Sequence, residues 1–135
     1  MSTTSNRSIV EAVFSALAQG ERQPFADAMA DDFSWTIAGG GPWARTRRGK
    51  GDVRRGLMAP LFAQFAGIYR NRAARIVCDG DVIVVECRGE VATKAGQRYD
   101  NQYCYVIEMR EGKMIALTEY MDTALAEAVL SPPPA

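Results

Sequence analysis

The 135-residue sequence contains no histidine, so acid or base chemistry near neutral pH falls to its carboxyl groups. Residues 113–121 alternate with a period of two, which places Glu119 on one strand face with Ile115, Leu117 and Met121. Burial among such side chains raises the pKa of a carboxyl group toward the range of a general acid or base. A second interpretation stays open, in which Glu119 lies in water at the rim of the sheet.

A second acid and an arginine occur at alternate positions of an earlier strand. Within residues 82–93, the even positions place Glu86, Arg88 and Glu90 on one face. We expect Arg88 to bridge Glu90 and Glu119 across neighbouring strands, so that one carboxylate stays ionised while desolvation keeps a proton on the other. This hypothesis requires the three side chains to converge inside a closed pocket.

Asp122 follows the same strand as Glu119 and precedes an alanine-rich segment. Its carboxylate is among those left to do any acid or base work in a chain without histidine. It can equally cap the helix that follows, because an aspartate before a helix accepts a hydrogen bond from a free backbone N–H of the first turn. Capping explains this residue type without any chemistry, so both interpretations are kept.

A row of tyrosines and one asparagine marks a third group of candidates. Alternation places Tyr99, Asn101, Tyr103 and Tyr105 on one strand face. Their hydroxyl and amide groups can orient a carbonyl or hydroxyl ligand, although aromatic cross-strand pairs also simply stabilise sheets. The predicted substrate contacts are Trp35, Asn101, Tyr103, Tyr105 and Leu117.

Basic residues cluster after a glycine-rich loop, and this combination can hold an anion. A solvated loop explains the same charges. The spacing matches no P-loop or dinucleotide fingerprint, so no nucleotide cofactor is expected. The cluster consists of Arg45, Arg47, Arg48, Lys50, Arg54 and Arg55.

Periodicity and capping signals place these candidates on a definite order of elements. Three helices are predicted before the long strands, over residues 9–17, 24–29 and 53–65. Ser8 caps the first of them and Asp52 the last. A short strand over residues 33–37 and a loop over 43–50 with a short strand at its end lie between them. Four long strands and a final helix follow, over residues 69–79, 82–93, 99–110, 113–121 and 124–130.

This order predicts an α+β fold in which a curved antiparallel or mixed sheet wraps around three N-terminal helices. We expect a cone-shaped barrel with an apolar pocket at its wide end. With 47% hydrophobic residues, the chain fits one domain over residues 1–130. Residues 131–135 contain three consecutive prolines and are expected to form a disordered tail.

Composition narrows the function classes further. Sixteen basic and sixteen acidic side chains cancel, which disfavours nucleic-acid or membrane partners. Cys78, Cys87 and Cys104 lack metal-ligand spacing and fit buried thiols of a cytoplasmic protein. No signal peptide or membrane-spanning run is predicted, and without histidine or a carboxylate cluster no metal is expected.

Four segments carry a resemblance to a known family: DDFSW, GKGDVRRGL, YDNQYCYVIEMREGKM and EYMDTALAEAVL. Together they resemble the nuclear-transport-factor-2-like superfamily, and specifically its SnoaL-like polyketide cyclase branch. The similarity extends over about residues 9–130 and lies in the order and spacing of elements. Because this superfamily includes both enzymes and binding modules, the resemblance implies the fold more firmly than the reaction.

Relatives within the superfamily imply different roles for the same candidates. Similarity to limonene-epoxide hydrolases implies that Arg88, Glu90 and Glu119 activate water and protonate an epoxide. This chain has Trp35 and Ile37 at the positions where that family has a tyrosine and an asparagine. The water-positioning part of that reaction is therefore missing.

Two other relatives give different expectations. Similarity to SnoaL-like cyclases implies that Asp122 is the acid or base of an aldol ring closure. Ketosteroid isomerases place an aspartate base on the first strand, but residues 33–38 contain no acid, which disfavours isomerisation of that type.

The residues and the resemblance together predict a protein that binds a small apolar, oxygen-bearing molecule. Its chemistry would be acid/base catalysis by carboxylates, with Glu119 as acid or base, as in epoxide hydrolysis, isomerisation or cyclisation. A non-catalytic ligand-binding or dimerisation module of the same fold is the alternative. Relatives often pair through the sheet, so the resemblance also implies a homodimer.

Overall fold

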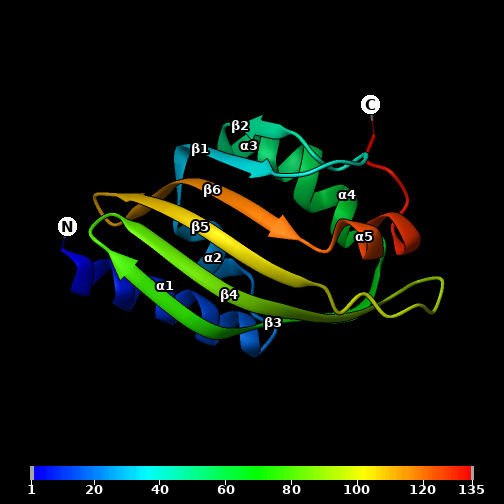
Figure 1. The fold of residues 1–135 in the computed structure, drawn as a ribbon, viewed down its shortest axis with the longest axis horizontal. Coiled ribbons are helices and arrows are strands. Elements are labelled where there is room, and N and C mark those ends of the chain that lie inside the picture. Colours follow the sequence, from blue (N-terminus) through cyan, green and yellow to red (C-terminus); the bar gives the residue numbers. More distant parts are fainter. Residues whose placement is uncertain (1, 135) are drawn as a thin grey trace.

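The computed structural model describes residues 2–134, without the side chains of Thr3 and Thr4. A curved sheet of six strands forms one layer, and helices pack on one of its faces (Figure 1). The strand order is β2-β1-β6-β5-β4-β3, with β1 and β6 parallel and the other neighbours antiparallel. The predicted α+β fold with a curved mixed sheet is confirmed, although the sheet is open between β2 and β3 instead of closing into a barrel.

Helix α1 spans Thr3–Ala18 and buries Val10, Phe14 and Leu17 against the sheet. Its cap is Ser2, whose side chain accepts a hydrogen bond from the Ser5 N–H at 3.2 Å, so the prediction of a cap at Ser8 is wrong. The earlier start is stabilised by a tertiary contact that local pattern does not reveal. Buried Asn6 donates to the carbonyl oxygen of Gly80 (3.0 Å) in the β3–β4 turn.

Helix α2 (Gln23–Asp27) begins with proline in its first turn, as predicted, but ends before Met29. Met29 instead begins strand β1 (Met29–Ile37), which starts four residues before the predicted strand over 33–37. A register shift between Met29 and Ser34 lets this extra length pair with β6. The short strand predicted at the end of the following loop is β2 (Thr46–Arg48), which pairs with β1.

The third helical region is continuous but irregular: α3 (Lys50–Val53), the π-helix η1 (Arg54–Met58) and α4 (Ala59–Phe62). It begins earlier than predicted, after Gly49 with a positive φ of 90°. Asp52 lies inside the first turn, where it pairs with Arg55 at 2.7 Å, and is not the cap. The π-helical turn widens the helix next to the cavity described below, a common position for such turns.

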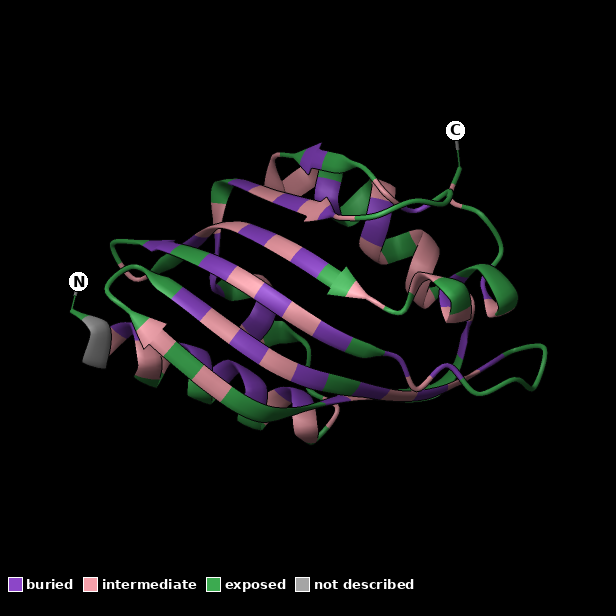
Figure 2. Ribbon diagram, viewed as in Figure 1, coloured by how far each residue is buried: buried purple, intermediate pink, exposed green. Residues whose placement is uncertain are grey.

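The long strands are β3 (Phe65–Asp79), β4 (Val82–Thr93), β5 (Gln102–Arg110) and β6 (Lys113–Met121), followed by α5 (Thr123–Val129). Along β4 and β5, buried and more exposed residues alternate (Figure 2). Odd positions such as Val85 and Tyr105 face the helices, and even positions such as Glu86 face outward. This alternation decides which candidate side chains can meet.

The chain leaves α5 along the helical region. Trp43 and Gln64 both donate side-chain hydrogen bonds to the backbone oxygen of Ser131, at 3.2 and 3.1 Å. Ser131 is thus fixed, whereas disorder of the remaining tail stays a prediction and Ala135 lies outside the described residues. Within residues 2–134, no helix has the length and apolar character needed to cross a membrane.

Candidate functional site

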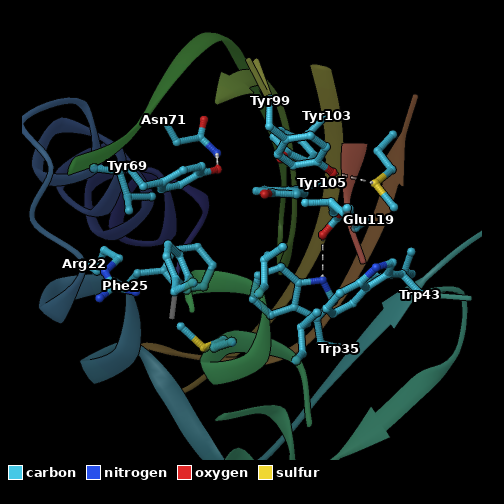
Figure 3. Close-up of a pocket in the computed structure, with 18 residues that line it drawn as sticks. Arg22, Phe25, Trp35, Trp43, Tyr69, Asn71, Tyr99, Tyr103, Tyr105 and Glu119 are labelled. Carbon is cyan, nitrogen blue, oxygen red and sulfur yellow. Dashed lines mark hydrogen bonds between the residues drawn. The ribbon is translucent and has the colours of Figure 1, made fainter. Parts of the chain in front are cut away.

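A largely apolar cavity lies between the concave face of the sheet and helices α1, α2 and α4 (Figure 3). Its volume is about 60 Å³, which suits a compact ligand or a few water molecules better than a drug-sized molecule. Aromatic side chains form much of its wall. These include Phe25, Trp35, Trp43, Phe62, Tyr69, Tyr99, Tyr103 and Tyr105.

Glu119 is the acidic group of this cavity. Its side chain extends from β6 toward the helices and is only 6% exposed. The indole Nε1–H of Trp35 donates a hydrogen bond to its Oε1 at 3.0 Å. Burial raises the pKa of Glu119 to about 7, and the Trp35 hydrogen bond and the charge of Arg47 only partly oppose this rise. Near neutral pH, Glu119 can therefore both accept and donate a proton.

Arg47 is a buried cation near this carboxyl group. It lies on β2 opposite Trp35 of β1, and neither of its terminal guanidinium nitrogens has a hydrogen-bond partner among the residues that the structure describes. Burial, and then the nearby Arg45, lower the pKa of Arg47, while Glu119 raises it. Arg47 thus takes the electrostatic position that we predicted for Arg88, although it forms no direct ion pair with Glu119 among the described residues.

Tyrosine hydroxyl groups provide the other polar atoms of the wall. Tyr105 lies directly across from Glu119 in the β5–β6 pairing, and Tyr103 is one inward position away on β5. Burial holds the pKa values of Tyr69, Tyr103 and Tyr105 well above the ordinary range, so these phenols stay protonated and can donate hydrogen bonds. Figure 3 shows the tyrosines and Glu119 around one space.

Asn71 is a cavity residue that sequence reasoning missed, together with its neighbour Tyr69. The Asn71 Nδ2 donates to the Tyr69 hydroxyl at 3.1 Å, whereas its buried Oδ1 has no hydrogen-bond partner within the described part of the chain. An amide oxygen buried without a partner costs free energy unless a ligand or water satisfies it. The available signal was an asparagine between charged residues in a predicted strand, which is weak until the inward face of β3 is known.

The family comparison explains this arrangement of sheet, helices and cavity. The sequence matches the family model of the SnoaL-like domain over residues 10–117. The chain belongs to the SnoaL-like family. The comparison with curated proteins gives no match.

Solved structures place this SnoaL-like chain in the nuclear-transport-factor-2-like fold. A nuclear-transport-factor-2-like protein from Burkholderia xenovorans LB400 is 26% identical, with a TM-score of 0.71 and coverage of 96% of this chain and 99% of that one. A protein from Jannaschia sp. CCS1 that is named as a SnoaL-like polyketide cyclase is 19% identical, with a TM-score of 0.77 and coverage of 98% and 95%. An LEH-like epoxide hydrolase from M. tuberculosis is 21% identical, with a TM-score of 0.69 and coverage of 90% and 86%.

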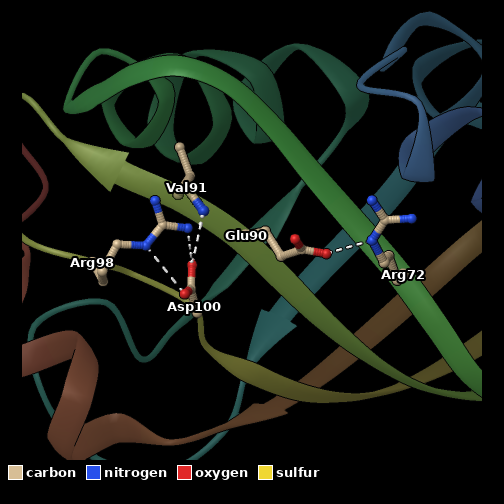
Figure 4. A network of polar contacts seen from close by, with 5 residues as sticks. All are labelled: Arg72, Glu90, Val91, Arg98 and Asp100. Carbon is tan, nitrogen blue, oxygen red and sulfur yellow. Dashed lines mark hydrogen bonds and ion pairs between the residues drawn. The ribbon is translucent and has the colours of Figure 1, made fainter.

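Within this SnoaL-like fold, the predicted convergence of Arg88, Glu90 and Glu119 is wrong. Even positions of β4 lie on the outer face of the sheet, whereas Glu119 of β6 lies on the inner face. Glu90 instead forms an ion pair with Arg72 of β3 (Figure 4). Arg88 is exposed on the outer face. The error arose because a shared face within one strand does not establish which face of the sheet that is.

Asp122 and Asn101 have structural contacts in the SnoaL-like chain. The Asp122 carboxylate accepts a hydrogen bond from the Leu125 N–H at 3.2 Å and caps α5, as the capping interpretation predicts. Asn101 accepts a hydrogen bond from the Asp122 N–H (3.2 Å) and donates one to the Asp122 carbonyl oxygen (3.2 Å). These bonds join the start of β5 to the end of β6, outside the cavity wall.

The other predicted substrate contacts lie either in the cavity wall or in the hydrophobic core. Trp35, Tyr103 and Tyr105 line the cavity, as expected for substrate contacts. Leu117 is 1% exposed and packs in the hydrophobic core without lining the cavity. Of the predicted side chains, the structure therefore brings together one carboxyl group and three aromatic rings.

Proposed function

We propose that this SnoaL-like protein binds a compact, mostly apolar molecule with a carbonyl oxygen and moves a proton on it through Glu119. The observation that carries the proposal is the burial of Glu119 in an aromatic cavity, with a pKa of about 7 and a hydrogen bond from Trp35. Perturbed carboxyl groups in clefts are often functional because a general acid or base works best near the ambient pH. The small cavity favours compact ligands.

The tyrosines supply the complementary part of the reaction. When the Glu119 carboxylate removes a proton from the carbon next to a carbonyl group, the electrons of that C–H bond move toward the carbonyl oxygen. A protonated Tyr105 or Tyr103 can donate a hydrogen bond to the resulting enolate oxygen. When a C=C bond is conjugated with the enolate, return of the proton from Glu119 to the far carbon of that system gives isomerisation. When the enolate carbon attacks a second carbonyl, a C–C bond closes the ring, and the proton held by Glu119 passes to the alkoxide oxygen formed there. One carboxyl group serves both reactions.

Epoxide hydrolysis by the Arg88–Glu90–Glu119 arrangement is not part of this proposal. Among the described residues, Glu119 is the only carboxylic acid that lines the cavity. Arg88 and Glu90 lie on the opposite face of the sheet. A reaction with a single acid/base group is therefore the better match to the site.

Deuterium exchange tests the proposal without knowledge of the natural substrate. We expect the protein to accelerate exchange of the hydrogens next to the carbonyl of 2-indanone in D2O, followed by proton NMR, with saturation as the ketone concentration rises. Quenching of tryptophan fluorescence measures binding in parallel, because Trp35 and Trp43 are the only two tryptophans and both line the cavity. Binding without accelerated exchange would favour the non-catalytic ligand-binding module, and absence of binding would contradict the proposal.

We also propose that two copies pair through the outer face of the sheet. An apolar row crosses it where Val77 pairs with Val84 and Val84 with Val106, and Val77 is 50% exposed. Tyr120 is 53% exposed on the same face. We expect light scattering to give twice the 14.8 kDa mass of one chain, and Val84→Glu to shift the protein to the monomer. A monomeric wild-type protein would contradict this prediction.

A further inference from the structure

A basic groove adjoins the mouth of the cavity, between α2 and the helical region formed by α3, η1 and α4. Arg22, Lys50 and Arg54 line this groove, and none of its described lining residues is acidic. Arg22, Met58 and Phe62 line both the groove and the cavity, so the two spaces are neighbours that share these side chains. The polarity of the site is therefore asymmetric, with an acid at one side of the cavity and cations at its mouth.

Arg22 is positioned for a ligand by an aromatic side chain. Its guanidinium carbon lies 3.8 Å from the centroid of the Phe62 ring, a cation–π contact that holds the planar group at the mouth. Figure 3 shows Arg22 on the side of the cavity away from Glu119. A guanidinium stacked in this way keeps its N–H groups free for a carboxylate.

Among residues 2–134, the cations of the groove have no carboxylate partner. Ion pairs among the described residues include none of Arg22, Lys50 and Arg54, and the nearby Asp52 pairs with Arg55. Positive charge concentrated at one side of a cleft attracts and orients anions, even when the whole chain is neutral. The charges of Lys50 and Arg54 in the helical region are thus available to a bound anion.

We propose that the ligand is an organic anion whose apolar ring occupies the cavity while its carboxylate stays at the mouth against Arg22, Lys50 and Arg54. This inference rests on the proposed function, since it names the class of molecule that the same cavity takes. The apolar wall excludes a charged group from the interior, and the groove is where the structure can accept one. The reacting part of the ligand then faces Glu119, at the other side of the cavity.

A matched pair of probes tests this inference, namely phenylacetate and phenylacetamide, which share a ring and differ in charge. Binding is measured by tryptophan fluorescence at about pH 6, where the carboxylate is ionised and Glu119 is mostly protonated. We expect phenylacetate to bind about fivefold more tightly than phenylacetamide at low salt, as one exposed charge contact allows. Raising NaCl from about 20 mM to about 300 mM should reduce this preference, because salt screens exposed charges.

Variants separate the groove from nonspecific charge effects. Arg22→Gln combined with Lys50→Gln should reduce the preference to less than about twofold. The control, Arg88→Gln combined with Lys94→Gln, removes the same charges from exposed positions that line neither space and should leave it unchanged. Equal binding of the two probes, or a preference that survives in the groove variant, would overturn the inference but not the proposed function. If neither probe binds while 2-indanone does, the inference fails and the proposed function stands; if none of the three binds, both fail.

Discussion

Replacing Glu119 by glutamine is expected to lower the rate of deuterium exchange into bound 2-indanone by about 10²- to 10⁴-fold, the usual contribution of one acid/base group. Glutamine keeps the size of the side chain and an oxygen that can accept the hydrogen bond from Trp35. It cannot take up or release a proton near neutral pH. Fluorescence-measured binding of the ketone should therefore stay within about threefold of wild type.

A second glutamate provides the matched control for this substitution. Glu108 lies on the neighbouring strand β5 and is exposed on the outer face. Glu108→Gln makes the same chemical change outside the cavity and should leave the exchange rate unchanged. If Glu119→Gln and Glu108→Gln have equal activity, Glu119 is not the acid/base group.

The free energy of unfolding is expected to fall by roughly 3 kcal/mol between about pH 4.5 and about pH 7 because of Glu119 alone. Its pKa is about 7 in the folded protein against 4.5 for an unperturbed glutamate, and the two values differ by about 2.5. Between them, the unfolded chain releases this proton while the folded protein keeps it. Rising pH therefore favours unfolding across this interval, and the effect levels off above pH 7, where both states are ionised.

The difference between wild type and Glu119→Gln isolates this contribution. The carboxyl group of Asp100 changes stability in the opposite direction, since its pKa is lowered, first by its hydrogen bond from Arg98. Such contributions cancel in the difference, because both proteins contain them. Urea unfolding at a series of pH values should show the variant gaining stability relative to wild type as pH rises from about 4.5 to about 7. A difference independent of pH would show that Glu119 is not desolvated.

Much of the fold follows from local pattern. The bounds of β4 and β6 match the predicted strands because alternation is regular there and glycine-containing turns follow β3 and β5. The inward position of Glu119 also follows from this alternation, since its neighbours Leu117 and Met121 are apolar. What local pattern missed is fixed by tertiary contacts, such as the start of α1 at Thr3, which the hydrogen bond from Asn6 to Gly80 stabilises.

The candidate site was less predictable, because it is assembled across strands and not along one. Alternation correctly grouped Arg88 with Glu90, but only the packing of helices on the opposite face shows that this group points away from Glu119. Arg47 stood among several loop arginines in the sequence, and its burial depends on how β2 pairs with β1. The basic groove likewise forms only because α2 and α3 lie on either side of it, next to the mouth of the cavity.

The most direct test of the acid/base role of Glu119 is a carbon-13 NMR titration of its carboxyl group. The signal is assigned by its absence from the spectrum of Glu119→Gln. We predict a titration midpoint near pH 7 for Glu119, because its carboxyl group is buried among aromatic rings. A midpoint near the ordinary value of 4.5 would contradict the claim that this SnoaL-like chain holds an acid/base group poised at neutral pH.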